Sequence, residues 1–173
     1  GADGRRPDHA LIDLLDWIRE NHLPREVPVV LFGYSGGAQF AHRFLLTHPA
    51  EASGALLAAA GWYTWPDTSL PFPHGVRFHD AAKKRFDAFL RKPLWVAVGK
   101  NDTRRDAQLR KSRELDVRQG PTRLARACNW TQAMRSMAAR RGCVPQVELR
   151  LLPDAGHSFS ECMWAGLGGV IDD

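Results

Sequence analysis

The chain has 173 residues, of which 44% are hydrophobic and 25% are charged, with a formal net charge of +5. This length and composition are typical of one globular domain with a sizeable core, and we expect a single domain over residues 1–173. No apolar run approaches the ~20 residues that a membrane-spanning helix needs, and no C-x-x-C pair exists, which excludes zinc-knuckle and thioredoxin-type sites.

The first half of the chain alternates between helical and strand patterns. Residues 7–24 have helical apolar spacing, with Asp8 as the expected N-cap. Residues 27–32 are nearly all apolar, which is typical of a strand buried on both faces of a parallel sheet. A helix is predicted over residues 36–48 and a second buried strand over residues 53–63. The strand leads into a loop at residues 62–80 that is rich in aromatic residues and proline.

The second half repeats this alternation. A charged helix is predicted over residues 81–91 and a strand over residues 93–99, followed by a basic excursion at residues 103–126. A helix over residues 129–142 and a strand over residues 145–153 follow, and the closing stretch is helical in pattern. Strands that alternate with helices predict a three-layer α/β/α sandwich with a mostly parallel sheet. In such sheets the reactive site lies beyond the carboxyl ends of the strands.

The basic excursion contains eight Arg or Lys residues and three acidic residues. It is interpreted as a solvated helical cap over the domain, in preference to a surface that steers anionic esters. A nucleic-acid partner is not expected, because aromatic residues are not interleaved with the basic ones and no nucleic-acid-binding motif is present.

Residues 33–37, Gly-Tyr-Ser-Gly-Gly, have the form G-x-S-x-G between a predicted buried strand and an amphipathic helix. This arrangement resembles the nucleophile elbow of the α/β-hydrolase superfamily. Side chains at Gly33 and Gly37 are expected to collide with the serine or with a neighbouring strand. The turn would expose the hydroxyl of Ser35 and direct the N–H of Gly36 at a developing oxyanion.

The resemblance implies an acid and a histidine after Ser35 in the chain, each following a strand. Asp102 follows the strand 93–99 and His157 follows the strand 145–153, so they are the expected orienting acid and base. Helix capping is the structural alternative for Asp102. Asp67 and Asp80, which follow the preceding strand, are the alternative candidates for the acid.

The remaining histidines are less suited to be the base. His74 and His79, in the aromatic loop, could face a pocket or the surface. The others lie on or beside helices and are expected to face solvent: His9, His22, His42 and His48.

The implied activity is hydrolysis of small-molecule carboxylic esters through an acyl-enzyme on Ser35, without a cofactor or metal. The sequence resembles the dienelactone-hydrolase, feruloyl-esterase and polyhydroxybutyrate-depolymerase-like groups. A non-catalytic binding domain of the same fold is the alternative. Six aromatic residues are the expected substrate pocket: Tyr34, Trp62, Tyr63, Trp65, Phe72 and Phe159.

The superfamily's sheet normally has further strands before the nucleophile strand, and one of their loops donates a second oxyanion N–H. Residues 1–28 contain no such pattern. We therefore expect that a missing N-terminal segment, or another chain such as a second copy, completes the sheet. The compartment stays open for the same reason, with the cytoplasm favoured over secretion.

The three cysteines are expected to be free thiols. Cys128 and Cys143 bracket a predicted helix and would lie some 22 Å apart at ~1.5 Å per residue, too far for a disulfide. A pairing of Cys162 with either one stays open. Trp130, Met134 and Met137 recur at helical spacing and are expected in the core.

Overall fold

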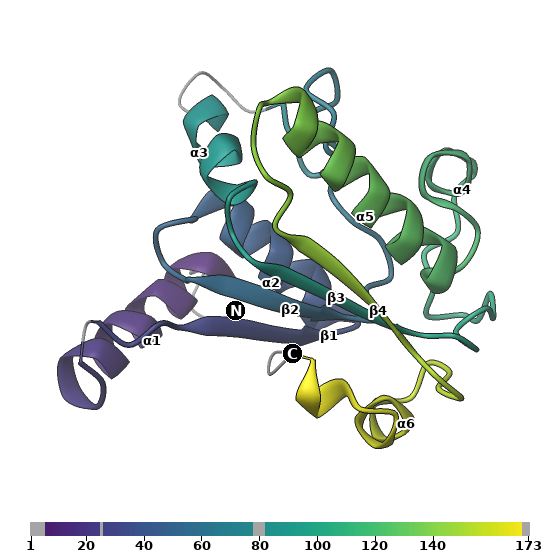
Figure 1. The fold of residues 1–173 in the computed structure, drawn as a ribbon, viewed down its shortest axis with the longest axis horizontal. Helices are drawn as coiled ribbons and strands as arrows, with labels where there is room; N and C mark the ends of the chain where they lie inside the picture. The colour runs from purple at the N-terminus through teal and green to yellow at the C-terminus, as the bar shows by residue number, and fades with distance from the viewer. Residues whose placement is uncertain (1–5, 25, 78–81, 171–173) are drawn as a thin grey trace.

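The computed structural model describes residues 6–24, 26–77 and 82–170. Its centre is a sheet of four parallel strands, in which neighbours along the chain are also neighbours in space (Figure 1). The strands are β1 (Val30–Tyr34), β2 (Gly54–Ala58), β3 (Leu94–Gly99) and β4 (Val147–Leu152). Because all four strands are parallel, their carboxyl ends meet at one edge of the sheet, which is the edge where the site is expected.

Helices cover both faces of this sheet (Figure 1). They are α1 (Pro7–Asn21), α2 (Gly36–Thr47), α3 (Ala82–Phe89), α4 (Arg113–Gln119), α5 (Arg123–Arg140), α6 (Phe159–Trp164) and the 3₁₀ helix η1 (Leu167–Gly169). The helices α2, α3 and α5 pack on one face, and α6 and η1 pack on the other. The predicted three-layer α/β/α sandwich is therefore confirmed.

Two apolar clusters hold the layers together, because successive strand residues point to opposite faces. Leu57 of β2 packs with the α2, α3 and α5 cluster, and its neighbour Leu56 packs with Cys162 and the C-terminal cluster. The predicted core positions of Trp130 and Met134 are confirmed, since both side chains are buried, whereas Met137 is only partly buried against the same cluster.

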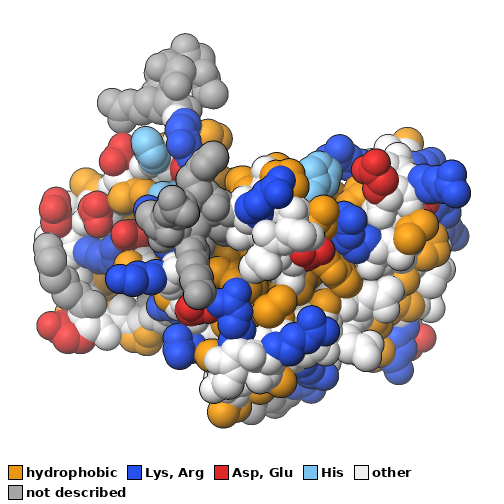
Figure 2. Space-filling view, turned by 90° about the horizontal axis from the view of Figure 1, so that it is seen from above, with side chains coloured by type: hydrophobic (Ala, Val, Ile, Leu, Met, Phe, Trp, Pro, Cys, Tyr) orange, Lys and Arg blue, Asp and Glu red, His pale blue; other side chains and the backbone are white. Residues whose placement is uncertain are grey.

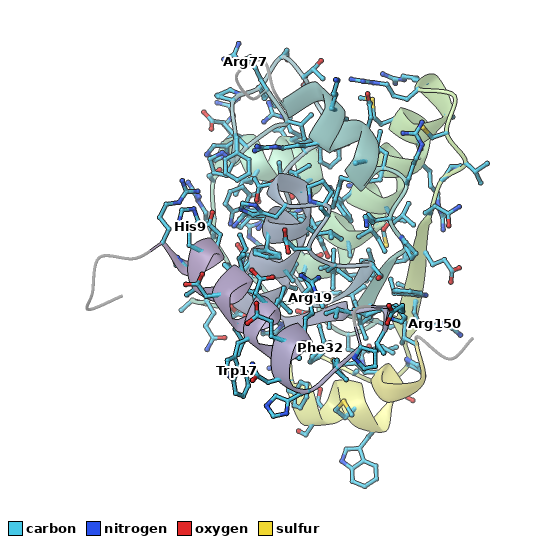
Figure 3. All side chains as sticks on the ribbon, turned by 90° about the vertical axis from the view of Figure 1, so that its left-hand side faces the viewer. His9, Trp17, Arg19, Phe32, Arg77 and Arg150 are labelled. Atoms are coloured by element: carbon cyan, nitrogen blue, oxygen red, sulfur yellow. The ribbon has the colours of Figure 1, made fainter. Side chains whose placement is uncertain are left out.

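The strand β1 lies at the edge of the sheet, and no strand among the described residues pairs with its outer side. Its residue Phe32 is 51% exposed, and Trp17 of α1 is 53% exposed (Figure 3 labels both). The prediction that this strand is buried on both faces is therefore wrong. An apolar edge strand of this kind is a surface on which chains pair or aggregate.

Two helix starts differ from the predictions. The N-cap of α1 is Arg6, and Asp8 lies in the first turn, where its carboxylate accepts hydrogen bonds from Arg6 and His48. The helix α5 begins at Arg123 and not at residue 129, because the hydroxyl of Thr122 caps it by accepting a hydrogen bond from the N–H of Ala125.

The basic excursion is only partly a solvated cap. It contains α4, which the sequence pattern did not separate, and the first turn of α5. Arg123 and Arg126 are buried, so the interpretation of the whole segment as solvated is wrong. On the face shown in Figure 2, Lys and Arg side chains are spread among hydrophobic and polar groups.

All three cysteines are free thiols, as predicted. Within the described ranges, every helix is too short or too polar to cross a bilayer.

Candidate active site

The chain turns sharply between β1 and α2, and Ser35 is the only residue between them. Its backbone has φ 53° and ψ −111°, a conformation that non-glycine residues rarely adopt. The N–H of Ser35 donates to the carbonyl of Ala58 at 2.8 Å, which ties the turn to the end of β2. The tight strand-to-helix turn therefore has the strained serine that the sequence predicts.

Glycine is required at one side of this turn only. A Cβ on Gly33 would meet the carbonyl group of Gly37 and would lie 2.6 Å from the N of Ala38. A Cβ on Gly37 would have no atom within 4 Å, so the expected collision at Gly37 is wrong. The helix backbone therefore crowds the end of β1, whereas position 37 faces open space.

The structure brings the three predicted polar residues together. Nε2 of His157 lies 3.2 Å from Oγ of Ser35, and Nδ1 of His157 lies 2.9 Å from Oδ2 of Asp102. A carboxylate can only accept, so Nδ1–H donates to Asp102 and Nε2 is left to accept the proton of the serine hydroxyl. The arrangement can deprotonate Ser35 and stabilise the resulting imidazolium.

The loops after β3 and β4 hold Asp102 and His157 against each other. The N–H of Asn101 donates to the carbonyl of Ala155 at 2.9 Å. A Cβ on Gly99 would collide with that same carbonyl group, so the close approach of the two loops requires glycine there. Asp102 is only 1% exposed.

Asp102 also contacts a buried cation that sequence reasoning missed. Nη1 of Arg123 lies 3.4 Å from Oδ1 of Asp102 and 2.7 Å from Oδ2 of Asp106, while Nη2 lies 3.0 Å from Oδ1 of Asp106. The hydrogen bonds from Arg123 hold the pKa of Asp106 well below its ordinary value. Burial lowers the pKa of Arg123, but the two carboxylates outweigh burial and raise it. Arg123 and Asp106 are therefore both charged at neutral pH.

The alternative candidates for the acid do not join this chain of hydrogen bonds. The carboxylate of Asp67 accepts hydrogen bonds from the N–H and the hydroxyl of Ser69 in its own loop. Asp80 and His79 lie outside the described residues.

The prediction that His42 faces solvent is wrong. His42 is buried, because its two ring nitrogens connect α2 to the loop after β2. His48 is half-buried beside Asp8, and His74 stacks on Trp62 with ring centroids 5.2 Å apart.

Tyr34 lies behind the histidine. Its ring stacks on the imidazole of His157 with centroids 5.4 Å apart, and Phe159 contacts the Tyr34 ring edge-on at 5.3 Å. The hydroxyl of Tyr34 is buried, and burial, together with the neighbouring Cys162 and Asp102 side chains, raises its pKa. This position supports the histidine ring, and Phe159 is half exposed beside it.

The aromatic loop does not form one pocket. Phe72 lines a cavity of ≈ 420 Å³ together with Gly36 of the elbow. Trp65 lines a separate cavity against α5. Tyr63 has no exposed surface and stacks on Trp130 at 4.5 Å, so its predicted pocket role is wrong. Trp62 is largely buried under the guanidinium of Arg43.

Comparisons with solved structures support the fold. A poly(aspartic acid) hydrolase from Sphingomonas sp. KT-1 is 30% identical and superposes with a TM-score of 0.83, over 98% of this chain and 67% of that one. The chain belongs to the α/β-hydrolase superfamily. The poly(3-hydroxybutyrate) depolymerase LpqC from Bordetella parapertussis is 29% identical, with a TM-score of 0.80 over 93% of this chain and 55% of that one.

A more distant α/β-hydrolase supports the fold alone. A ferulic acid esterase is 16% identical and superposes with a TM-score of 0.53, over 91% of this chain and 56% of that one. This chain thus spans between about half and two thirds of the length of these relatives. Searches against protein-family models and curated protein sequences gave no match.

Proposed function

We propose that this α/β-hydrolase domain cleaves carboxylic esters through an acyl-enzyme on Ser35. One observation carries the proposal: Ser35, His157 and Asp102 form a continuous chain of hydrogen bonds at the carboxyl ends of three parallel strands. A domain that only binds ligand has no need of a strained serine aligned with a buried histidine–carboxylate pair.

The reaction follows from the atoms at the elbow. Oγ of Ser35 attacks the ester carbonyl while Nε2 of His157 takes its proton, and Asp102 stabilises the imidazolium. Gly36 is the first residue of α2, so its N–H has no acceptor within the helix and is placed to donate to the oxyanion. The imidazolium then protonates the departing alkoxide. In the second half of the reaction, His157 takes a proton from water as the water attacks the acyl-enzyme, and it returns that proton to Oγ of Ser35 as the acid leaves.

The names of the relatives support a hydrolase and leave the scissile bond open. Poly(3-hydroxybutyrate) depolymerase and ferulic acid esterase are named for ester substrates, whereas poly(aspartic acid) hydrolase is named for an amide polymer. We favour an ester, because the cavity beside Gly36 is lined by the apolar rings of Phe40, Phe44 and Phe72, which suit a small acyl or alcohol group.

A panel of 4-nitrophenyl esters tests the proposal on the 173-residue chain and on its Ser35→Ala variant. We expect turnover in the parent and a loss of at least a thousandfold in the variant, because the remaining groups cannot form an acyl-enzyme. Thermal melting curves that coincide would show that the variant is folded. Equal rates in the two proteins would exclude Ser35 from the reaction.

A further inference from the structure

The cavity beside the elbow contains an arginine whose charge is unmatched. Arg43 is on α2, seven residues after Gly36, and both residues line the cavity of ≈ 420 Å³. Seven residues are about two helical turns, so the two positions lie on the same side of α2, about 10 Å apart along its axis. A substrate held at Gly36 can therefore extend along this cavity to Arg43.

The guanidinium of Arg43 is held by stacking and makes few polar contacts. Its carbon lies 3.9 Å from the centroid of the Trp62 ring, and Nε donates to the hydroxyl of Thr64 at 3.4 Å. Neither Nη atom has a hydrogen-bond or ion-pair partner in the described part of the chain, and Nη2 is shielded from solvent. An unpaired donor in such a site is unfavourable, so an acceptor that a ligand brings to the guanidinium would be stabilising.

A second cation lies near the same ring. The guanidinium carbon of Arg110 is 5.1 Å from the centroid of Trp62. Burial and the charge of Arg110 lower the pKa of Arg43 to about 10. The other buried arginines, Arg123 and Arg126, each have carboxylate partners. Neither Arg43 nor Arg110 has a carboxylate partner among the described residues. Together they leave a net positive potential at the end of the cavity that Arg43 lines.

The one carboxylate on the cavity wall is already used. Asp8 lines the cavity, where it pairs with Arg6 at 2.7 Å and with His48 at 3.2 Å. It therefore does not neutralise Arg43.

We propose that Arg43, with Arg110 near the same ring, binds a carboxylate of the substrate whose ester carbonyl is held at Gly36; the backbone positions of these two residues are about 10 Å apart along α2. The inference rests on the proposed function and specifies its substrate class as esters that carry a distant carboxylate. A planar guanidinium fixed against a ring suits this group, because its N–H donors match the two carboxylate oxygens. Phe72 and Phe40 would contact the apolar chain between the two ends.

A matched pair of substrates tests this site. Mono-4-nitrophenyl suberate and 4-nitrophenyl octanoate have acyl chains of equal length and differ in the terminal carboxylate. We expect the ratio of kcat/KM for the suberate ester to kcat/KM for the octanoate ester to fall about tenfold in Arg43→Gln, mainly because KM for the suberate ester rises. The fall should be smaller in Arg110→Gln and in Arg43→Lys. The ratio should also fall at high salt in the parent protein. Arg113→Gln removes an equal charge from an exposed position on α4 and should leave the ratio unchanged.

Titration calorimetry with suberate gives a readout that does not depend on turnover. Suberate should bind the parent and the Ser35→Ala variant with equal affinity, and it should bind Arg43→Gln at least tenfold more weakly. Inorganic phosphate should bind each protein more weakly than suberate does. If no ester is cleaved but suberate binding depends on Arg43, the ester reaction fails and the anion site stands. If folded Arg43→Gln keeps both the parent's kcat/KM ratio for the two esters and the parent's affinity for suberate, the proposed carboxylate site is overturned. Phosphate binding as tight as suberate overturns the carboxylate assignment.

Discussion

Arg123 links the candidate acid to the rest of the fold. Its guanidinium is buried between the carboxyl groups of Asp102, which is also buried, and Asp106, which is partly exposed. Ion pairs of this kind contribute little net stability relative to an apolar replacement, but removing one partner leaves an uncompensated charge. Arg123 does not reach Ser35 in the hydrogen-bond chain, and we expect it to act by fixing the position of Asp102.

Replacing Arg123 should show whether it positions Asp102 or contributes to substrate binding. We expect Arg123→Met to lower kcat for ester hydrolysis about tenfold to a hundredfold with little change in KM, because Asp102 loses the donor that orients its second oxygen. The free energy of unfolding should fall by about 3 kcal/mol. Steady-state kinetics and urea unfolding measure the two effects.

A matched control exists in an exposed pair nearby. Arg105 contacts Asp116 at 2.7 Å on the surface, where solvent screens an ion pair and its contribution to stability is small. Arg105→Met should therefore leave kcat almost unchanged. Equal losses of kcat in the two variants would show that Arg123 has no special relation to Asp102.

At the same scale, single residues mark the limit of sequence reasoning. The order of Ser35, Asp102 and His157 after successive strands sufficed to predict which side chains meet, because parallel strands end at one edge. Arg123 could not be found in this way, since its contact with Asp102 spans 21 positions and depends on how α5 crosses the sheet. Gly37 was misjudged because the free space around a helix start depends on packing.

At the scale of elements, His42 connects α2 to the loop that follows β2. Its Nδ1 lies 3.0 Å from the carbonyl of Ala38, and its Nε2 accepts from the N–H of Thr64 at 3.0 Å. A buried imidazole with one donating and one accepting nitrogen must be neutral. Burial, and then the charge of Arg43, lower its pKa to about 3 from an ordinary 6.5.

This histidine should make the fold sensitive to acid. The unfolded chain binds a proton at His42 below pH 6.5, whereas the folded protein does so only near pH 3, so stability falls as pH falls through this window. We expect the parent to lose about 2 kcal/mol more than His42→Gln between pH 7 and pH 5, because glutamine does not titrate. Urea unfolding at the two pH values measures the difference. A parallel pH dependence in both proteins would show that His42 is not neutral in the fold.

The prediction of elements succeeded where local patterns agree with tertiary packing. Alternating apolar strands and amphipathic helices sufficed for the layer order. The N-cap Thr122 was overlooked because the basic composition of residues 103–126 was interpreted as one surface segment, and the burial of β1 was overestimated because composition does not show which strand lies at the edge.

At the scale of the whole molecule, the parallel sheet explains why the proposed catalytic residues meet at one edge. The end of β1 supplies Ser35, the loop after β3 supplies Asp102, and the loop after β4 supplies His157. The aromatic loop after β2 contributes Phe72 to the neighbouring cavity. Superfamily membership follows from the arrangement of these ends together with the 30% identity to the Sphingomonas hydrolase.

The central claim is that this edge makes Ser35 a nucleophile, and covalent labelling with a fluorophosphonate probe tests it most directly. In the folded 173-residue chain, we expect one adduct, mapped to Ser35 by peptide mass spectrometry. Labelling should be absent in Ser35→Ala and after denaturation, and should be at least a hundredfold slower in His157→Gln. A folded parent protein that stays unlabelled, or that labels as fast without His157 as with it, would contradict the claim.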